Sequence, residues 1–315
     1  MTTHLRAEPS HMAAASSPRV ASADCARRAR YFDSTTAFDI PHPKVPCHQF
    51  LDERAAALNP ATGTCLIPLD LSAALDLDFA ATTPLVLTRY ARIRAGESLE
   101  TTFRASGTIH YVIAGAGETR QDGARIAWNP GDVFCLPGGR AAEHTAGEQD
   151  CVLWIATDEP VYAHTHAAAP PADDASVVAV HYPAQDIQER LAAVQDKLRD
   201  QRGAGLALIF SSESQVHNRL TTPTLSLALN SLLPGGGQRA HRHNAAAITL
   251  VVQGRDCYSL VGGERIDWID HAVMITPPGD VHSHHNDSGA SAQFLIVQDS
   301  GLYYTARTMG FEYAE

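Results

Sequence analysis

The chain has 315 residues, of which 44% are hydrophobic and 19% are charged. This composition is typical of a globular protein with one or two domains, and it excludes a chain that is disordered throughout. The net charge of −11 disfavours a nucleic-acid-binding protein, whose surface is normally basic. No apolar run approaches the roughly 18 residues of a membrane-spanning helix. We therefore expect neither a nucleic acid nor a membrane as partner.

The N-terminal segment, residues 1–30, is predicted to be a disordered tail. It is rich in Ala and Ser, has no sustained period, and lacks the apolar stretch of a secretory signal. The six Cys of the chain form no CxxC pair and show no zinc-finger spacing. We therefore expect a cytoplasmic protein with free thiols, in a reducing compartment.

Short apolar segments make up most of the remaining chain. Residues 31–80 alternate Pro, His and short apolar pieces, which predicts irregular segments and edge strands around a later core. From Thr83 onward, apolar runs of four to nine residues alternate with Gly-containing turns, a pattern typical of an all-β sandwich or barrel. A linker rich in Ala and Pro precedes a predicted surface helix over 183–202. The apolar stripe of that helix consists of Ile187, Leu191, Val194 and Leu198.

The two β-rich halves resemble each other. Gly96 and Gly115 have the same separation along the chain as Gly235 and Gly254. The stretch IAWNPGDVFCLPGG, at 126–139, matches IDWIDHAVMITPPG, at 266–279, with several residues in register. Two matching segments at nearly the same offset indicate an internal duplication. The predicted parts are a first barrel with its wrapping segment over 31–165, a linker with the helix over 166–205, and a second barrel over 206–315.

Four histidines of the second repeat have the spacing of metal ligands. His241 and His243 are separated by one residue, and alternate side chains of a strand share one face. His282 and His284 repeat this spacing after a predicted hairpin with a Gly-Gly turn. A barrel can bring the two flanking strands together. Three neutral imidazoles on one wall would suit Fe, Zn, Ni, Cu or Mn.

These stretches resemble the two motifs of the cupin family. The first motif is G, five residues, HxH, three or four residues, E, six residues and G. Its matched positions are Gly235, His241, His243 and Gly254. The second motif is G, five residues, PxG, two residues, H, three residues and N. Its matched positions are Pro277, Gly279, His282 and Asn286, with His271 in place of the first Gly.

The acidic ligand of the family is missing in the second repeat. Ala247 stands at its position, and no carboxylate lies nearby in the sequence. The resemblance therefore implies a site of three histidines, His241, His243 and His282. The first repeat has Thr102 and Arg104 at the HxH positions, Thr108 at the acidic position and Ala142 at the third His position. We expect that repeat to bind no metal.

The duplicated layout, with the stretches HRHN, GGERIDW and HSHHN, resembles gentisate 1,2-dioxygenase and related salicylate-type bicupins. This resemblance implies an all-β fold of two tandem cupin (double-stranded β-helix, jelly-roll) barrels with a short helical linker. It also implies a homo-oligomeric Fe(II)-dependent dioxygenase that uses O2 on a small hydroxy-aromatic acid. Zn, Ni and Mn remain alternatives for the metal. Two further readings stay open: a non-oxidative isomerase, lyase or hydrolase that uses the metal as a Lewis acid, and a non-enzymatic small-molecule-binding protein.

Four further residues are candidates for the site. His284 lies on the face of His282 and is a candidate catalytic group that orients a substrate oxygen or moves a proton; the alternative is a supporting or surface histidine. Arg307 could bind a substrate carboxylate, or form a surface ion pair. Tyr304 could line the mouth of the site, or pack in the core. Gln253 shares the parity of the HxH pair and could approach the substrate.

Overall fold

The structure is a computed structural model that describes residues 24–198 and 206–314. Most of the predicted tail, residues 1–23, lies outside the described residues, and so do residues 199–202 of the predicted helix. The chain divides into a unit up to His42, with the short helix α1 (Asp24–Arg28), and a second unit over Pro43–Glu315. No helix within the described ranges is long and apolar enough to cross a membrane.

The first barrel combines a six-stranded and a four-stranded sheet. Their strand orders are β11-β8-β5-β10-β3-β2 and β4-β9-β6-β7. The strands are β2 (Cys65–Pro68), β3 (Leu87–Ile93), β4 (Ser98–Thr101), β5 (Gly107–Ala114), β6 (Gly117–Gln121), β7 (Ala124–Trp128), β8 (Val133–Pro137), β9 (Ala142–Ala146), β10 (Cys151–Thr157) and β11 (Val180–Tyr182).

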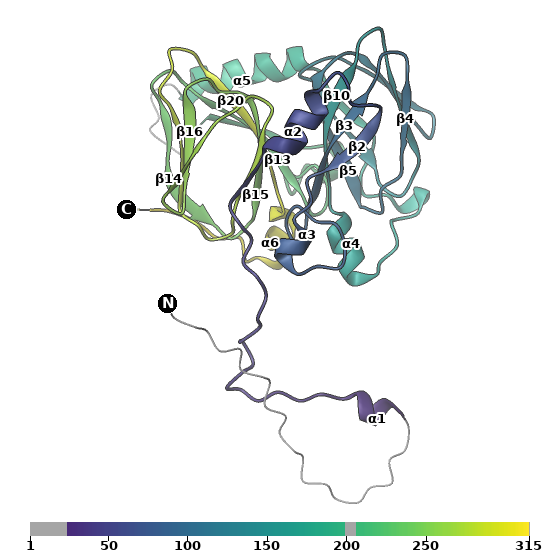
Figure 1. The fold of residues 1–315 in the computed structure, drawn as a ribbon, viewed down its shortest axis with the longest axis vertical. Coiled ribbons are helices and arrows are strands. Elements are labelled where there is room, and N and C mark those ends of the chain that lie inside the picture. Colours follow the sequence, from purple (N-terminus) through teal and green to yellow (C-terminus); the bar gives the residue numbers. More distant parts are fainter. Residues whose placement is uncertain (1–23, 199–205, 315) are drawn as a thin grey trace, which may run out of the picture. The chain divides into compact units, whose positions relative to one another are not determined.

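The second barrel combines a six-stranded and a five-stranded sheet. Their strand orders are β1-β18-β15-β20-β13-β12 and β17-β16-β19-β14-β21. The strands are β1 (His48–Phe50), β12 (Leu206–Phe210), β13 (Ser226–Leu232), β14 (Gly237–His243), β15 (Ala247–Gln253), β16 (Cys257–Val261), β17 (Glu264–Asp267), β18 (Val273–Thr276), β19 (His282–Asn286), β20 (Ala292–Gln298) and β21 (Phe311–Tyr313). The expected all-β fold of two tandem barrels is confirmed, and the barrels lie side by side in Figure 1.

Short helices connect these strands. They are α2 (Leu51–Leu58), α3 (Ser72–Leu75), α4 (Glu159–Thr165), α5 (Ala184–Leu198), α6 (Ser300–Ala306) and the 3-10 turns η1 (Ala172–Asp174) and η2 (Glu213–Gln215). The predicted surface helix is α5, and Ile187 and Leu191 of its apolar stripe are buried. The outer face of the helix is exposed, as the amphipathic pattern predicts.

Each barrel receives one strand from the other half of the chain. β1 precedes the first barrel in the sequence but pairs with β18 of the second. β11 precedes the second barrel but pairs with β8 of the first. In both cases a helix and a further strand follow, and that strand joins the barrel next in the sequence. The duplicated unit therefore begins with a strand, a helix and a strand, and its two copies fall in the predicted wrapping segment and in the predicted linker with its helix.

The two six-stranded sheets bury one hydrophobic core between them. That core includes Tyr90 and Trp154 from the first barrel and Leu250 and Leu295 from the second. Each such fully buried side chain contributes roughly 1.5–3 kcal/mol to folding. The Tyr90 hydroxyl also donates a hydrogen bond of 2.6 Å to the carbonyl of His271 in the other barrel. Separate clusters fill the interior of each barrel. We therefore expect the two barrels to unfold together.

Corresponding hairpins of the two barrels have the same kind of turn. Asp122 and Gly123, between β6 and β7, both have positive φ angles, 47° and 84°. Gly262 and Gly263, between β16 and β17, have φ angles of 58° and 92°. Two consecutive positive φ values are what a type I′ turn requires, and Asp and Gly tolerate them.

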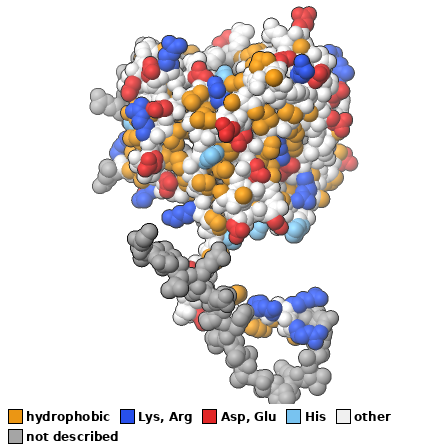
Figure 2. Space-filling model, viewed as in Figure 1, with side chains coloured by type: hydrophobic (Ala, Val, Ile, Leu, Met, Phe, Trp, Pro, Cys, Tyr) orange, Lys and Arg blue, Asp and Glu red, His pale blue; other side chains and the backbone are white. Residues whose placement is uncertain are grey.

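On the face shown in Figure 2, acidic and basic side chains are mixed with hydrophobic ones.

Candidate metal centre

The structure brings His241, His243 and His282 together on two neighbouring strands. His241 on β14 stands directly opposite His282 on β19. All three side chains face inward and are buried, with exposed fractions of 4%, 7% and 3%. One ligand atom from each lies within 4.8 Å of the others. This arrangement arises from the alternation of β14, which turns every second side chain into the barrel.

The backbone fixes the same tautomer in all three rings. In each ring Nδ1 lies within hydrogen-bond distance of a backbone carbonyl, which can only accept, so Nδ1 carries the proton. The acceptors are the carbonyl oxygens of Arg239, Ala245 and Asp280, at 2.7, 2.8 and 2.9 Å from His241, His243 and His282. Nε2 of each ring therefore keeps its lone pair. Such a hydrogen bond behind a ligating imidazole orients the ring and raises its basicity toward a metal.

The three rings are also held neutral. Burial lowers the pKa of His241 and His243, and it lowers the pKa of His282 to about 3. A histidine must be deprotonated at one nitrogen before it can bind a metal. The folded chain meets this condition at neutral pH without releasing a proton from these rings.

The position opposite the missing acidic ligand is occupied by a glutamine that the sequence analysis did not identify. Ala247 pairs with Gln298 at the end of β20. Nε2 of Gln298 lies 3.1 Å from Nε2 of His243. Gln298 is far from His243 in the sequence and belongs to neither motif. Only the pairing of β15 with β20 could have identified it.

His284 lies beside the three histidines as part of a buried hydrogen-bonded triplet. Its Nδ1 is 2.8 Å from the hydroxyl of Ser259, which also accepts a hydrogen bond of 2.8 Å from Nε1 of Trp268. Its ring centroid is 5.9 Å from that of His282. Burial holds the pKa of His284 well below its usual value. Its Nε2 has no hydrogen-bond partner in the part of the chain that the structure describes.

The first barrel contains the same triplet at the equivalent positions of the first repeat. Nδ1 of His144 is 2.8 Å from the hydroxyl of Thr119, which accepts a hydrogen bond of 2.9 Å from Nε1 of Trp128. Here, however, Nε2 of the histidine is also engaged, 3.0 Å from the hydroxyl of Thr101.

The strand register of the first barrel corrects the alignment of its ligand positions by one residue. Thr101 pairs with Ala142 as His241 pairs with His282. Phe103 accepts the backbone hydrogen bond of Gly139, as the carbonyl of His243 accepts that of Gly279. The positions are therefore Thr101 and Phe103, not Thr102 and Arg104. Gly96 and Gly235 are separated by one residue fewer than Thr101 and His241, so matching the two glycines shifts the positions after them by one residue.

Three predicted substrate-binding residues form no hydrogen bond or ring contact with the three histidines. Gln253 is exposed at the opposite end of β15 from Ala247, and its amide donates to the carbonyl of Ser291 at 3.0 Å. Strand parity did not apply to it, because β14 and β15 belong to different sheets. Tyr304 is 48% exposed on α6. Arg307 has a left-handed conformation at the end of α6, and its guanidinium donates to carbonyls of that helix. The structure does not bring these side chains to the three histidines.

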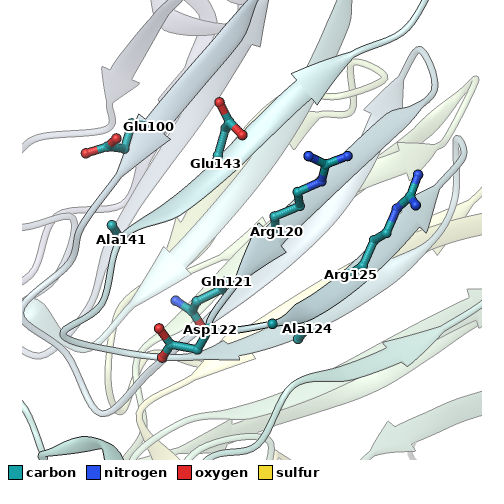
Figure 3. Close-up of a pocket in the computed structure, with 9 residues that line it drawn as sticks. Glu100, Arg120, Gln121, Asp122, Ala124, Arg125, Ala141 and Glu143 are labelled. Atoms are coloured by element: carbon teal, nitrogen blue, oxygen red, sulfur yellow. The ribbon is translucent and has the colours of Figure 1, made fainter.

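A cavity lies in the first barrel, away from this site. It has a volume of about 360 Å³ and is formed around the β6–β7 hairpin of the first barrel (Figure 3). Arg120 and Arg125 stand opposite each other on its strands, and both form ion pairs with Glu118. Arg140 is paired with Asp122. Since these charged groups partner one another at the surface, we do not place the chemistry there.

Comparison with known proteins agrees with this geometry. Residues 229–298 match the cupin domain family. The chain is 35% identical to 5-aminosalicylate 1,2-dioxygenase of Comamonas sp. over 120 residues, which is 38% of this chain and 32% of that protein. It is 33% identical to gentisate 1,2-dioxygenase of Ralstonia sp. over 78 residues, which is 25% of this chain and 22% of that protein. The matched segment thus spans about a third, or less, of these relatives.

The similarity of fold extends over most of the chain. Salicylate 1,2-dioxygenase from Pseudoaminobacter salicylatoxidans, in a crystal structure of its adducts with gentisate, aligns with a TM-score of 0.70. The alignment covers 89% of this chain and 88% of that chain at 14% sequence identity. Residues 229–298 of the second barrel therefore match the cupin domain, and the chain as a whole has the two-barrel fold of that salicylate dioxygenase. Over the segments that match, its sequence is similar to those of 5-aminosalicylate and gentisate 1,2-dioxygenases.

Proposed function

We propose that the protein is an Fe(II)-dependent dioxygenase that acts on a small hydroxy-aromatic acid. The observation that carries this proposal is the convergence of three neutral imidazoles, His241, His243 and His282, in a barrel where Ala247 replaces the acidic ligand. The curated relatives are named for dioxygenation of 5-aminosalicylate, 1-hydroxy-2-naphthoate and gentisate. These three compounds share a carboxylate next to a hydroxyl on an aromatic ring.

The donor set fits a ferrous ion. Imidazole nitrogen suits iron as well as Zn, Ni and Mn, and each ring here already has its proton on the nitrogen that faces the backbone. A ferrous ion held by the three Nε2 atoms would supply the redox centre and the open coordination positions that dioxygen chemistry needs. Three neutral ligands would leave its full positive charge, which favours an anionic, chelating substrate.

The chain's own side chains would position the substrate and move a proton. The barrel wall holds the three rings in one orientation, so a substrate and O2 would meet in a fixed geometry rather than by collision. Ser259 and Trp268 hold the ring of His284 from behind. Its free Nε2 would then orient a substrate oxygen or accept and return a proton there. Gln253, Tyr304 and Arg307 have no part in this proposal.

We also propose a reducing, cytoplasmic setting. It is supported by the free thiols of Cys47, Cys65, Cys135, Cys151 and Cys257. The homo-oligomer that the family resemblance implies stays a prediction.

The proposal is tested by oxygen consumption. The protein is reconstituted anaerobically with Fe(II) and mixed with 5-aminosalicylate, gentisate, salicylate or 1-hydroxy-2-naphthoate in an oxygen-electrode cell. We expect substrate-dependent O2 uptake that is absent from the His241→Ala, His282→Ala double variant. If the iron-loaded protein consumes no oxygen with any of the four, while Zn or Mn is retained on purification, the non-oxidative enzyme becomes the better account.

A further inference from the structure

Gln298 occupies the side of the site from which the acidic ligand has been lost. It is the last residue of β20 and pairs with Ala247 on one side and with Ser226 on the other. Its neighbour Asp299 stands at the N-cap position of α6, and its carboxylate accepts a hydrogen bond of 3.0 Å from the backbone N–H of Ala246 rather than from the helix. The backbone of Gln298 is therefore held between two strands and the start of a helix, and only its side chain is free to turn.

The direction of its hydrogen bond follows from the tautomer of His243. Nδ1 of His243 carries the proton, because it faces the carbonyl of Ala245 at 2.8 Å. Nε2 of His243 can then only accept, so the amide N–H of Gln298 donates to it at 3.1 Å. This hydrogen bond occupies the lone pair that a metal would need. Metal binding must therefore break it and move the Gln298 amide.

The side-chain amide of Gln298 also carries an oxygen, Oε1, which could bind a metal after the amide has moved. Oε1 of Gln298 makes no hydrogen bond within the part of the chain that the structure describes. Two donors of one ion lie no more than about 4 Å apart, twice a metal–nitrogen distance of about 2.0–2.1 Å. The terminal amide of Gln298 is already within that range of Nε2 of His243. A half-turn of the amide would present Oε1 where Nε2 of Gln298 now lies.

The first barrel provides a natural comparison. Asp158 stands at the N-cap position of α4 and accepts a hydrogen bond of 2.8 Å from the backbone N–H of Ser106, so it corresponds to Asp299. The residue before it, Thr157, therefore corresponds to Gln298. Its hydroxyl lies 2.9 Å from the carboxylate of Glu159 and 3.2 Å from the carbonyl of Leu87, and it forms no hydrogen bond with a histidine. The long amide side chain occurs in the barrel that has the three histidines.

We propose that Gln298 is a fourth, neutral ligand of this metal site and binds through Oε1. This inference rests on the metal site of the proposed function but not on dioxygen chemistry. An amide oxygen in place of a carboxylate would fill the position beside Ala247 without reducing the charge of the ion. A chelating substrate could displace such a weak ligand more easily than it could displace a carboxylate.

Cobalt binding tests this role without any turnover. Co(II) is titrated anaerobically into the metal-free full-length protein, and its dissociation constant and visible d–d spectrum are recorded. We expect Gln298→Ala to weaken Co(II) binding by at least about tenfold and to change the spectrum, and Gln298→Glu to bind at least as tightly as the wild type. The matched control is Gln293→Ala, on the same strand, whose amide contacts Gln188 instead.

The opposite result has a distinct meaning. If Gln298 only blocks Nε2 of His243, Gln298→Ala will bind Co(II) as tightly as the wild type or more tightly, with an unchanged spectrum, and the inference is overturned. The His241→Ala, His282→Ala double variant separates this from failure of the proposed function. If that variant still binds Co(II) like the wild type, the triad itself is not the metal site. Thermal melts of the metal-free variants establish that each is folded.

Discussion

His284 and His144, at equivalent positions of the two repeats, make the same hydrogen bond in the two barrels. Each places Nδ1 at 2.8 Å from a hydroxyl, that of Ser259 or Thr119, and each hydroxyl accepts a tryptophan N–H. The two rings differ at Nε2. Thr101 engages Nε2 of His144, whereas in the second barrel the corresponding position is His241. Both barrels thus have the buried triplet of histidine, hydroxyl and tryptophan, whereas the residues at the ligand positions beside it differ.

Removing the hydroxyl of the triplet should lower the stability of the protein in either barrel, but it should lower activity only in the second barrel. Ser259→Ala leaves Nδ1 of His284 and the indole of Trp268 without their partner, which costs about 1–3 kcal/mol. Thr119→Ala should lower the free energy of unfolding by a similar amount. Only Ser259→Ala should also lower kcat. Urea unfolding and oxygen uptake measure the two effects, and an equal loss of kcat in both variants would argue against a special role for the second triplet.

His284 itself should matter for turnover more than for metal binding. His284→Gln keeps a polar side chain of similar reach but cannot move a proton. We expect kcat to fall by about 10²–10⁴-fold, the range of general acid–base catalysis, while the iron content stays at the wild-type level. Steady-state oxygen uptake and metal analysis of the same preparation check this. Retention of full kcat would remove His284 from the mechanism.

The stability of the fold should depend on pH through Asp299. Burial raises the pKa of this carboxyl from 3.8 to about 7. A carboxyl whose pKa is higher in the folded chain favours folding while it is protonated, and this contribution is lost as the pH rises toward 7. Asp299→Asn keeps the acceptor for Ala246 but cannot ionise.

Relative to the wild type, Asp299→Asn should therefore gain stability between pH 5 and pH 8. The gain is about 1.4 kcal/mol for each pH unit below the folded pKa. Chemical unfolding at the two pH values measures it. If the difference between variant and wild type is the same at both, the carboxyl is not titrating in this range.

Metal removal should destabilise the wild type but not a variant without the ligands. An ion that binds only the folded chain raises the free energy of unfolding in proportion to the logarithm of its concentration over Kd. We expect a chelator to lower the Tm of the wild type and to leave the Tm of the His241→Ala, His282→Ala variant unchanged. Calorimetry with and without chelator decides this, and a shift of the same size in both would place the stabilising metal elsewhere.

The sequence was sufficient for the parts of the site that depend on local spacing. His241 and His243 are two residues apart, so any strand places them on one face, and His282 follows from a motif with fixed Pro and Gly positions. The internal repeat predicted two barrels. Gly262 and Gly263 predicted a hairpin whose φ angles the structure has.

The sequence could not predict the features of the fold and of the site that depend on strand pairing. The pairing of β1 with the barrel of the other repeat has no local signal, because its three residues would fit any sheet edge. Gln298 reaches the site only because β20 lies beside β15. Gln253 was assigned to the site by parity along the sequence, which holds within a strand and not between sheets. The prediction of Thr102 is wrong by one residue. The turn glycines of the two repeats are one residue closer together in the sequence than the strand residues that follow them.

The central claim is that His241, His243 and His282 hold an iron ion, and its most direct test is a count of iron. The wild type and the His241→Ala, His282→Ala variant are loaded with Fe(II) anaerobically, desalted and analysed by mass spectrometry. The account predicts about one iron per chain in the wild type and essentially none in the variant. Equal iron in both, or none in either, would contradict it.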